Sequence, residues 1–254
     1  TCSKKNRILT KMIKSGNPAL SKKTFDDLKS KTGEIMTLDG AVNKIAMSLA
    51  ILLFAAYYTY TNALMSFIGV GFGGGFIVAL VTIFKKEWAP ITVPIYAILE
   101  GLALGAFSKL FADIFEPGIV PQAISLTLGI LIALLFAYKT KIIKATENFK
   151  LGLFAATAGI AVVYLISFLM SFFGGTGLPI MNPANASMLS IGFSLFVVVI
   201  ASLNLVMDFD FIEKGVENGA PKYMEWYSAF GLLLTLIWLY VEILRLLAKL
   251  SSRK

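Results

Sequence analysis

Residues 187–212 decide the fold class of this chain; they read SMLSIGFSLFVVVIASLNLVMDFDFI. Before Asp208 the stretch carries no charged side chain and is dominated by Val, Leu, Ile and Phe. Its length exceeds the ~20 apolar residues that cross the hydrocarbon core of a bilayer. A helix over this range would satisfy its own backbone hydrogen bonds in lipid. The stretch therefore predicts a membrane-spanning α-helix.

The same apolar pattern repeats along the chain. Apolar residues make up 57% of the sequence, charged residues make up only 15%, and the mean hydropathy is +0.78. A water-soluble fold cannot bury so much apolar surface. We expect an all-α, polytopic membrane protein with seven transmembrane helices and no soluble catalytic domain. The expected spans cover residues 43–61, 63–84, 90–111, 120–139, 151–174, 187–212 and 223–247.

The distribution of charge predicts two regions and an orientation. Ten of the 23 Lys and Arg residues lie between Lys4 and Lys44. We expect residues 1–42 to form a cytoplasmic, Lys-rich N-terminal segment and residues 43–250 to form the transmembrane domain. The basic loops at 85–86 and 139–150 fall on the same side as this segment, as the positive-inside rule requires. Seven spans then put the basic end of the chain outside, which conflicts with that rule.

The absence of histidine and the scarcity of cysteine limit the chemistry. The chain has no histidine, which is the usual general base and the usual switch at physiological pH. Its single cysteine, Cys2, cannot form an internal disulfide or a thiolate metal cluster. We also find no HExxH or Gly-x-Ser-x-Gly motif, so we expect no enzyme. Proton-linked behaviour would have to come from carboxylates.

Glycines at a spacing of four residues predict close helix packing. The pairs are Gly69 and Gly73, Gly71 and Gly75, and Gly101 and Gly105. Small residues at this spacing let two membrane helices approach closely. A phosphate-binding loop would need a neighbouring strand, which the sequence does not predict.

Acidic residues inside the predicted spans are the candidate functional residues, because carboxylates at membrane depth are costly and usually have a purpose. Asp208 and Asp210 end the sixth span and point about 200° apart on a helix, so only one should face the bundle axis. Asn204 shares a face with Asp208. The full set of candidate gating or ion-binding residues is Asp208, Glu242, Asp210, Glu100 and Glu225.

Each candidate has a structural alternative. Glu242 lies deep in the seventh span, but Arg245, three residues later, could neutralise it in an ion pair. Asp210 and Glu225 lie nearer the water, where simple solvation explains a charge. Two carboxyl groups brought together in a dry bundle would share a proton or bind a cation, and calcium prefers such hard oxygen ligands. This arrangement would make a cation gate without histidine.

At these residues the sequence resembles the Bax inhibitor-1 family, the transmembrane Bax-inhibitor-motif proteins. The resemblance covers roughly residues 43–250 and is carried mainly by the sixth and seventh spans. The matching stretches are GFSL at 192–195, DFDFI at 208–212, LYVEI at 239–243 and Glu100-Gly101. A bacterial subgroup is suggested by NPAL at 17–20, EWY at 225–227 and EILRLL at 242–247.

The resemblance implies six helices around a central seventh, and a pH-sensitive calcium leak controlled by two acids. Asp208 takes the first acidic position and Glu242 the second, where the family pattern has Asp. The sequence between the two acids is longer than the pattern, with residues 213–222 expected as an extended polar loop. A shifted alignment would put Thr235 at the second acidic position.

The leading hypothesis is therefore a calcium leak channel of the cell (inner) membrane, gated by protonation of Asp208 and Glu242, which would also be the calcium ligands. It needs no cofactor other than calcium as the transported or bound ion. The alternative is a non-conducting regulator that binds a membrane protease or another membrane protein. The expected partners are the lipid bilayer, calcium ions and, in the alternative, that membrane protein; no nucleic acid is expected.

Overall fold

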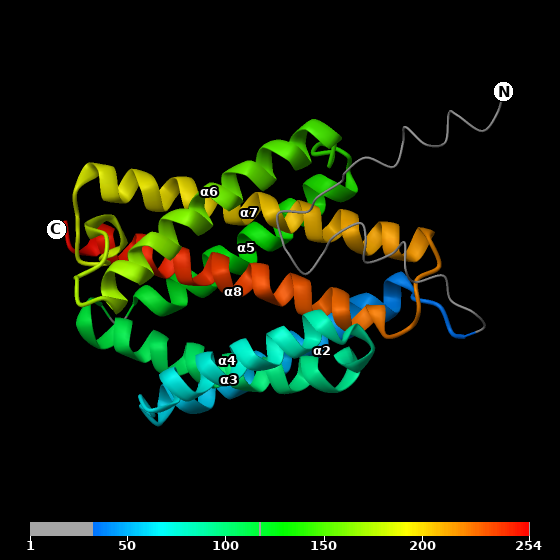
Figure 1. Ribbon diagram of the computed structural model, residues 1–254, viewed down its shortest axis with the longest axis horizontal. Coiled ribbons are helices and arrows are strands. Elements are labelled where there is room, and N and C mark those ends of the chain that lie inside the picture. Colours follow the sequence, from blue (N-terminus) through cyan, green and yellow to red (C-terminus); the bar gives the residue numbers. More distant parts are fainter. Residues whose placement is uncertain (1–32, 117, 254) are drawn as a thin grey trace.

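The computed structural model describes residues 33–116 and 118–253 of the 254-residue chain. The described residues contain seven helices that are long and apolar enough to cross a membrane (Figure 1), which confirms the predicted all-α, seven-span fold. The long helices are α2 (Leu38–Thr61), α3 (Phe67–Phe84), α4 (Ala89–Ile114), α5 (Ile119–Lys139), α6 (Glu147–Phe172), α7 (Met188–Glu217) and α8 (Met224–Ser251). Short 3₁₀ turns, η2 (Lys86–Trp88) and η3 (Pro179–Met181), precede α4 and α7.

Local capping residues fix several helix starts. The side chains of Thr37, Thr146 and Ser187 each accept a hydrogen bond from a backbone N–H in the first turn of the following helix. These bonds satisfy N–H groups that have no partner within the helix. Capping by Thr37 explains why α2 begins at Leu38, before the predicted start at residue 43.

Half of the predicted polar loop at 213–222 is helical. Helix α7 continues to Glu217, and only residues 218–223 connect it to α8. The turn is closed by Gly219, whose φ of +62° is a left-handed conformation that glycine adopts without strain. The segment before α2 pairs with this turn, since Met36 N–H donates to the Ala220 carbonyl at 2.7 Å. The Lys-rich residues 1–32 lie outside the described part of the chain.

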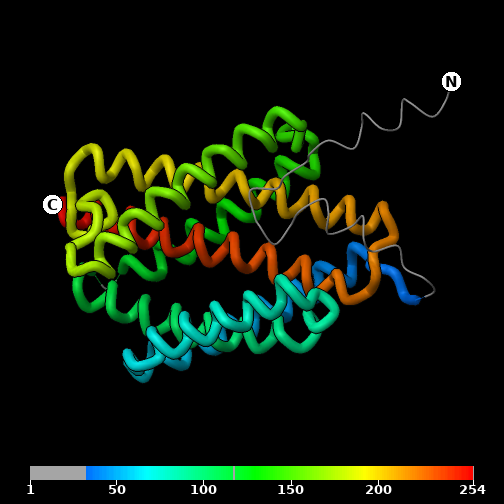
Figure 2. Tube along the Cα trace, in the orientation of Figure 1, coloured from blue at the N-terminus to red at the C-terminus, as the bar shows by residue number. Residues whose placement is uncertain are grey.

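Helix α8 occupies the centre of the bundle. It packs against α2, α4, α5 and α7, while α3 lies against α4 and α6 lies against α7. In Figure 2 the C-terminal helix runs through the middle of the molecule, between the α2–α4 group and the α5–α7 group. Buried side chains on many sides of α8, such as Phe230, Leu233, Leu239 and Leu244, reflect this position.

Glycines set the closest helix contacts. A β-carbon on Gly71 would lie 2.6 Å from the Leu99 carbonyl oxygen of α4. On the other side of α4, β-carbons on Gly101 and Gly105 would overlap backbone atoms of α2. In contrast, Gly69 and Gly73 have open space around them. Of the two glycine pairs in α3 that were predicted to pack closely, only Gly71 and Gly75 lie at a helix interface.

Candidate functional site

Four carboxyl groups are buried within the described spans. The exposed fraction is 6% for Glu100, 0% for Asp208, 1% for Glu225 and 2% for Glu242. A charged carboxylate in this environment is costly unless a cation, a hydrogen-bond donor or a proton neutralises it. How each of the four is accommodated therefore indicates what it can do.

Glu100 lies near the middle of α4 and contacts α3. Its carboxyl group occupies the space beside Gly75, where a β-carbon would overlap Oε1. Within residues 33–116 and 118–253, no side chain forms an ion pair or hydrogen bond with this carboxyl group. Glu100 is thus a buried acid at mid-helix that the described residues do not neutralise.

Asp208 and Asp210 have different surroundings, although they are two residues apart. Asp208 is fully buried in α7. Asp210 Oδ2 is 2.8 Å from Lys150 Nζ on α6 and 2.6 Å from Lys214 Nζ on α7. Lys150 is itself buried, with 2% of its side chain exposed. Asp210 is therefore the acceptor in a cluster that joins α6 to α7. The nearby Asn204 does not bind a carboxylate in this cluster; it donates to Thr157 at 3.0 Å.

Glu242 makes the ion pair that its sequence spacing predicts. Its Oε1 accepts hydrogen bonds from Arg245 Nη1 at 2.8 Å and from the Tyr164 hydroxyl at 2.6 Å. Tyr164 belongs to α6, so Glu242 connects the central helix to the outer α6. A buried carboxylate with both a cation and a hydroxyl donor is well compensated.

The register of α7 and α8 separates Asp208 from Glu242. Lys249 Nζ of α8 donates to Ser194 Oγ of α7 at 2.8 Å, which aligns the two antiparallel helices. From this contact Asp208 is about four helical turns along α7, whereas Glu242 is only about two turns along α8. The two acids are thus offset by about 10 Å along the helix axes. Thr235, not Glu242, lies at the level of Asp208.

Glu100 and Asp208 lie at similar depth on two different neighbours of α8. The Tyr96 ring of α4 packs against the Phe230 ring of α8 at 5.0 Å between centroids. The hydroxyls of Ser108 on α4 and Tyr240 on α8 are 2.6 Å apart. This contact lies nearer the C-terminal ends of the two helices and fixes the same parallel register. Both contacts put Glu100 within about one helical turn of Thr235, which is the level of Asp208. The central level of the bundle therefore carries a buried acid on α4 and another on α7.

Glu225 is buried, contrary to the expectation that it lies near water. Its Oε1 accepts hydrogen bonds from Thr37 N–H and Thr37 Oγ1, each at 3.0 Å, and lies 3.2 Å from Lys222 Nζ. Gly40 leaves room for this carboxylate, which lies at the N-terminus of α2. A negative charge there is favourable because unpaired N–H groups point toward it. The geometry makes Glu225 a contact between α2 and α8.

Lys249 is a buried residue that the sequence analysis did not single out. Its Nζ donates to the Ile180 carbonyl at 2.7 Å, the Ser190 carbonyl at 3.2 Å and Ser194 Oγ at 2.8 Å. These bonds attach the 174–187 loop and the start of α7 to the end of α8. Ser190 and Ser194, spaced by four residues, are the only sequence signal for such a polar contact within an apolar span.

The described residues do not gather the predicted calcium ligands. No group of three or more Cys, Asp or Glu residues lies together within 33–116 and 118–253. Asp208 and Glu242 are separated in the way described above. In this conformation the buried acids are arranged at several depths, not as one preformed cation cage.

Comparison with known proteins adds one finding. A family model described as Bax inhibitor 1 like matches residues 17–252, nearly the whole chain. No curated protein matches the sequence closely enough to count as a relative.

Proposed function

Because the chain belongs to the Bax inhibitor 1-like family, we propose that it is a pH-sensitive calcium leak channel controlled by buried carboxyl groups. The observation that carries this proposal is the pair of buried acids, Glu100 on α4 and Asp208 on α7, near one level of the bundle. Acids inside membrane spans typically mark ion or proton pathways.

Protonation would change how these acids interact with the bundle. A protonated carboxyl group is neutral and can remain packed between helices, which keeps the pathway closed. A deprotonated group in low-dielectric surroundings needs compensation by water or a cation. Calcium, as the transported ion, binds carboxylate oxygens readily and would supply that compensation. We therefore expect calcium flux to increase as the pH rises.

Asp208 and Glu242 have separate parts in this proposal, because their axial offset does not allow them to share one proton in the present conformation. Asp208 would act at the central level. Glu242 would act about two turns further along α8, where Arg245 and Tyr164 hold its charge. If Arg245 and Tyr164 moved away from Glu242, its carboxylate could bind the transported cation. The Asp210 and Glu225 contacts would keep helices in register on the side of the α7–α8 turn.

The test is calcium entry into liposomes that contain the purified protein and a trapped calcium indicator, followed over about pH 5 to 8. Wild-type protein should give a flux that rises with pH. Asp208→Asn and Glu242→Gln should each give a calcium flux that no longer changes with pH. Asp113→Asn, which changes a carboxylate with an exposed side chain, should behave as wild type. A wild-type flux equal to that of empty liposomes at every pH would remove the channel proposal and favour the regulatory alternative.

A further inference from the structure

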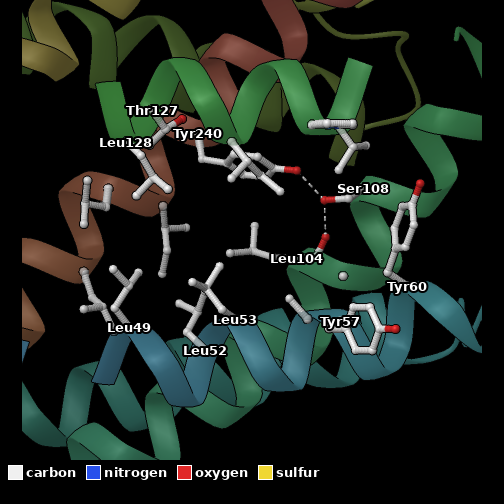
Figure 3. A pocket seen from close by; sticks show the side chains of 18 of the residues that line it. Leu49, Leu52, Leu53, Tyr57, Tyr60, Leu104, Ser108, Thr127, Leu128 and Tyr240 are labelled. Carbon is white, nitrogen blue, oxygen red and sulfur yellow. Dashed lines mark hydrogen bonds between the residues drawn. The ribbon is translucent and has the colours of Figure 1, made fainter. Parts of the chain in front are cut away.

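A lateral cavity of about 720 Å³ lies between α2, α4, α5 and α8. Figure 3 shows Leu49, Leu52 and Leu53 of α2 on one side of this cavity, with Thr127 and Leu128 of α5 on the opposite side. Leu104 of α4 and Tyr240 of α8 form its inner wall. A cavity of this size is in the range of those that hold small ligands.

The cavity wall is apolar and uncharged. None of the residues that line it is Asp, Glu, Lys or Arg, so the buried acids of the proposed leak are not part of it. Its innermost hydroxyl groups already bond to each other, because Ser108 Oγ and Tyr240 OH are 2.6 Å apart and Ser108 also donates to the Leu104 carbonyl (Figure 3). An apolar occupant would therefore leave none of these three groups without a partner.

The cavity opens toward the lipid. Leu53 and Tyr57, on the α2 side of the opening, have 41% and 69% of their surface exposed, and Pro121 is exposed on the α5 side. These residues belong to spans that face the hydrocarbon of the bilayer. The cavity is thus continuous with the lipid-facing surface of the protein, and acyl chains surround its entrance.

We propose that this cavity binds one acyl chain of a membrane phospholipid between α2 and α5. A free fatty acid would bring a carboxylate, and no basic side chain lines the cavity to pair with it. A phospholipid keeps its charged headgroup at the membrane surface instead. Tyr57 and Tyr60 lie in the last turns of α2, where amphipathic aromatic rings are typically found at headgroup level. The bound acyl chain would fill the space between α2 and α5, which line opposite sides of the cavity.

Photolabelling tests this proposal directly. The full-length protein is reconstituted in phosphatidylcholine vesicles that contain a phosphatidylcholine with a diazirine on one acyl chain, and labelled residues are mapped by mass spectrometry. Phe76 on α3 and Phe168 on α6, each 63% exposed, report ordinary contact with bulk lipid. The proposal predicts several-fold stronger labelling of cavity residues such as Leu52 and Ile124. Labelling no stronger than at the two Phe positions would overturn it.

A cavity-filling variant supplies the matched control. Ala56 lines the cavity, whereas Ala50 is an exposed residue of the same helix outside it. Ala56→Phe should remove the excess labelling and reduce the amount of lipid retained after detergent purification, while Ala50→Phe should change neither. Circular dichroism and gel filtration establish that each variant is folded. Unchanged labelling and lipid retention in folded Ala56→Phe would contradict the proposal. The wild-type map decides the question alone if that variant does not fold.

Discussion

Gly75 of α3 leaves the space that the Glu100 carboxyl group of α4 occupies. A β-carbon at position 75 would overlap Oε1 of Glu100, which is the end of a flexible side chain. The glycine therefore does more than bring two helices together. It determines where an uncompensated acid lies within the membrane-spanning bundle.

This contact predicts that Gly75→Ala alters the pH dependence of calcium flux with little loss of stability. The added methyl group forces the Glu100 carboxyl group to rotate, but it meets no backbone atom of α4 among its nearest neighbours. Liposome flux over a pH series and a thermal unfolding curve measure the two effects. Gly73→Ala, which adds a methyl group in open space on the same helix, is the control. Identical pH profiles for the two variants would refute the assigned role of Gly75.

A second glycine should affect stability instead. A β-carbon on Gly105 would overlap the Ala56 carbonyl oxygen and Thr59 Oγ1 of α2, and the backbone oxygen cannot rotate away. Gly105→Ala should lower the free energy of unfolding by about 1–3 kcal/mol. Gly159→Ala, where the new methyl group has open space on α6, should cause no loss. Equal stability of the two variants in detergent unfolding would show that the α2–α4 approach is looser than described.

The ion pair of Glu242 predicts a non-additive effect. Arg245→Met would leave a 2%-exposed carboxylate with only the Tyr164 hydroxyl, and breaking such a buried pair costs about 3–5 kcal/mol. Adding Glu242→Gln should restore most of that loss, because no buried charge remains. Lys109→Met breaks the more exposed pair with Asp113 and should leave the free energy of unfolding nearly unchanged. Additive losses in the Glu242/Arg245 double variant would argue against a coupled pair.

Lys249 should hold the 174–187 loop in place. Lys249→Met removes the donor to the Ile180 and Ser190 carbonyl groups, at a cost of about 1–3 kcal/mol. Limited proteolysis should then cut the loop faster than in the wild type. Arg253→Met, which removes only an exposed contact with Met188 at the start of α7, serves as the control. A cleavage rate that Lys249→Met leaves unchanged would mean that the loop is held by other contacts.

Hydropathy was sufficient to predict the seven spans, whereas the central position of the last helix was implied by the resemblance to the Bax inhibitor-1 family. Each span has the length and composition that lipid requires, and this signal is local to the segment. The pair Glu242 and Arg245 was also predictable, since both residues lie on one helix at a fixed spacing. Helix boundaries were less accurate where polar residues continue a helix, as in the last turn of α7 up to Glu217.

The arrangement of the candidate site depended on contacts that no local pattern encodes. Burial of Glu225 depends on Thr37, 188 positions earlier in the chain. The level of Asp208 relative to Glu242 depends on the α7–α8 register, which the Lys249 contact sets. Two of the basic residues near the end of the chain also make contacts within the protein. Arg245 and Lys249 are engaged inside the bundle, so they are not free loop charges of the kind that determine orientation.

The most direct test of the central claim is the pH profile of calcium entry into liposomes that contain Glu100→Gln. Glutamine fills nearly the same space beside Gly75 but cannot lose a proton, so the account predicts a flux that no longer rises with pH as it does in the wild type. Glu100→Asp, which keeps a titrating carboxyl group, should retain a pH-dependent flux. If Glu100→Gln keeps the wild-type profile, the buried acid on α4 does not control the leak, and the central claim is wrong.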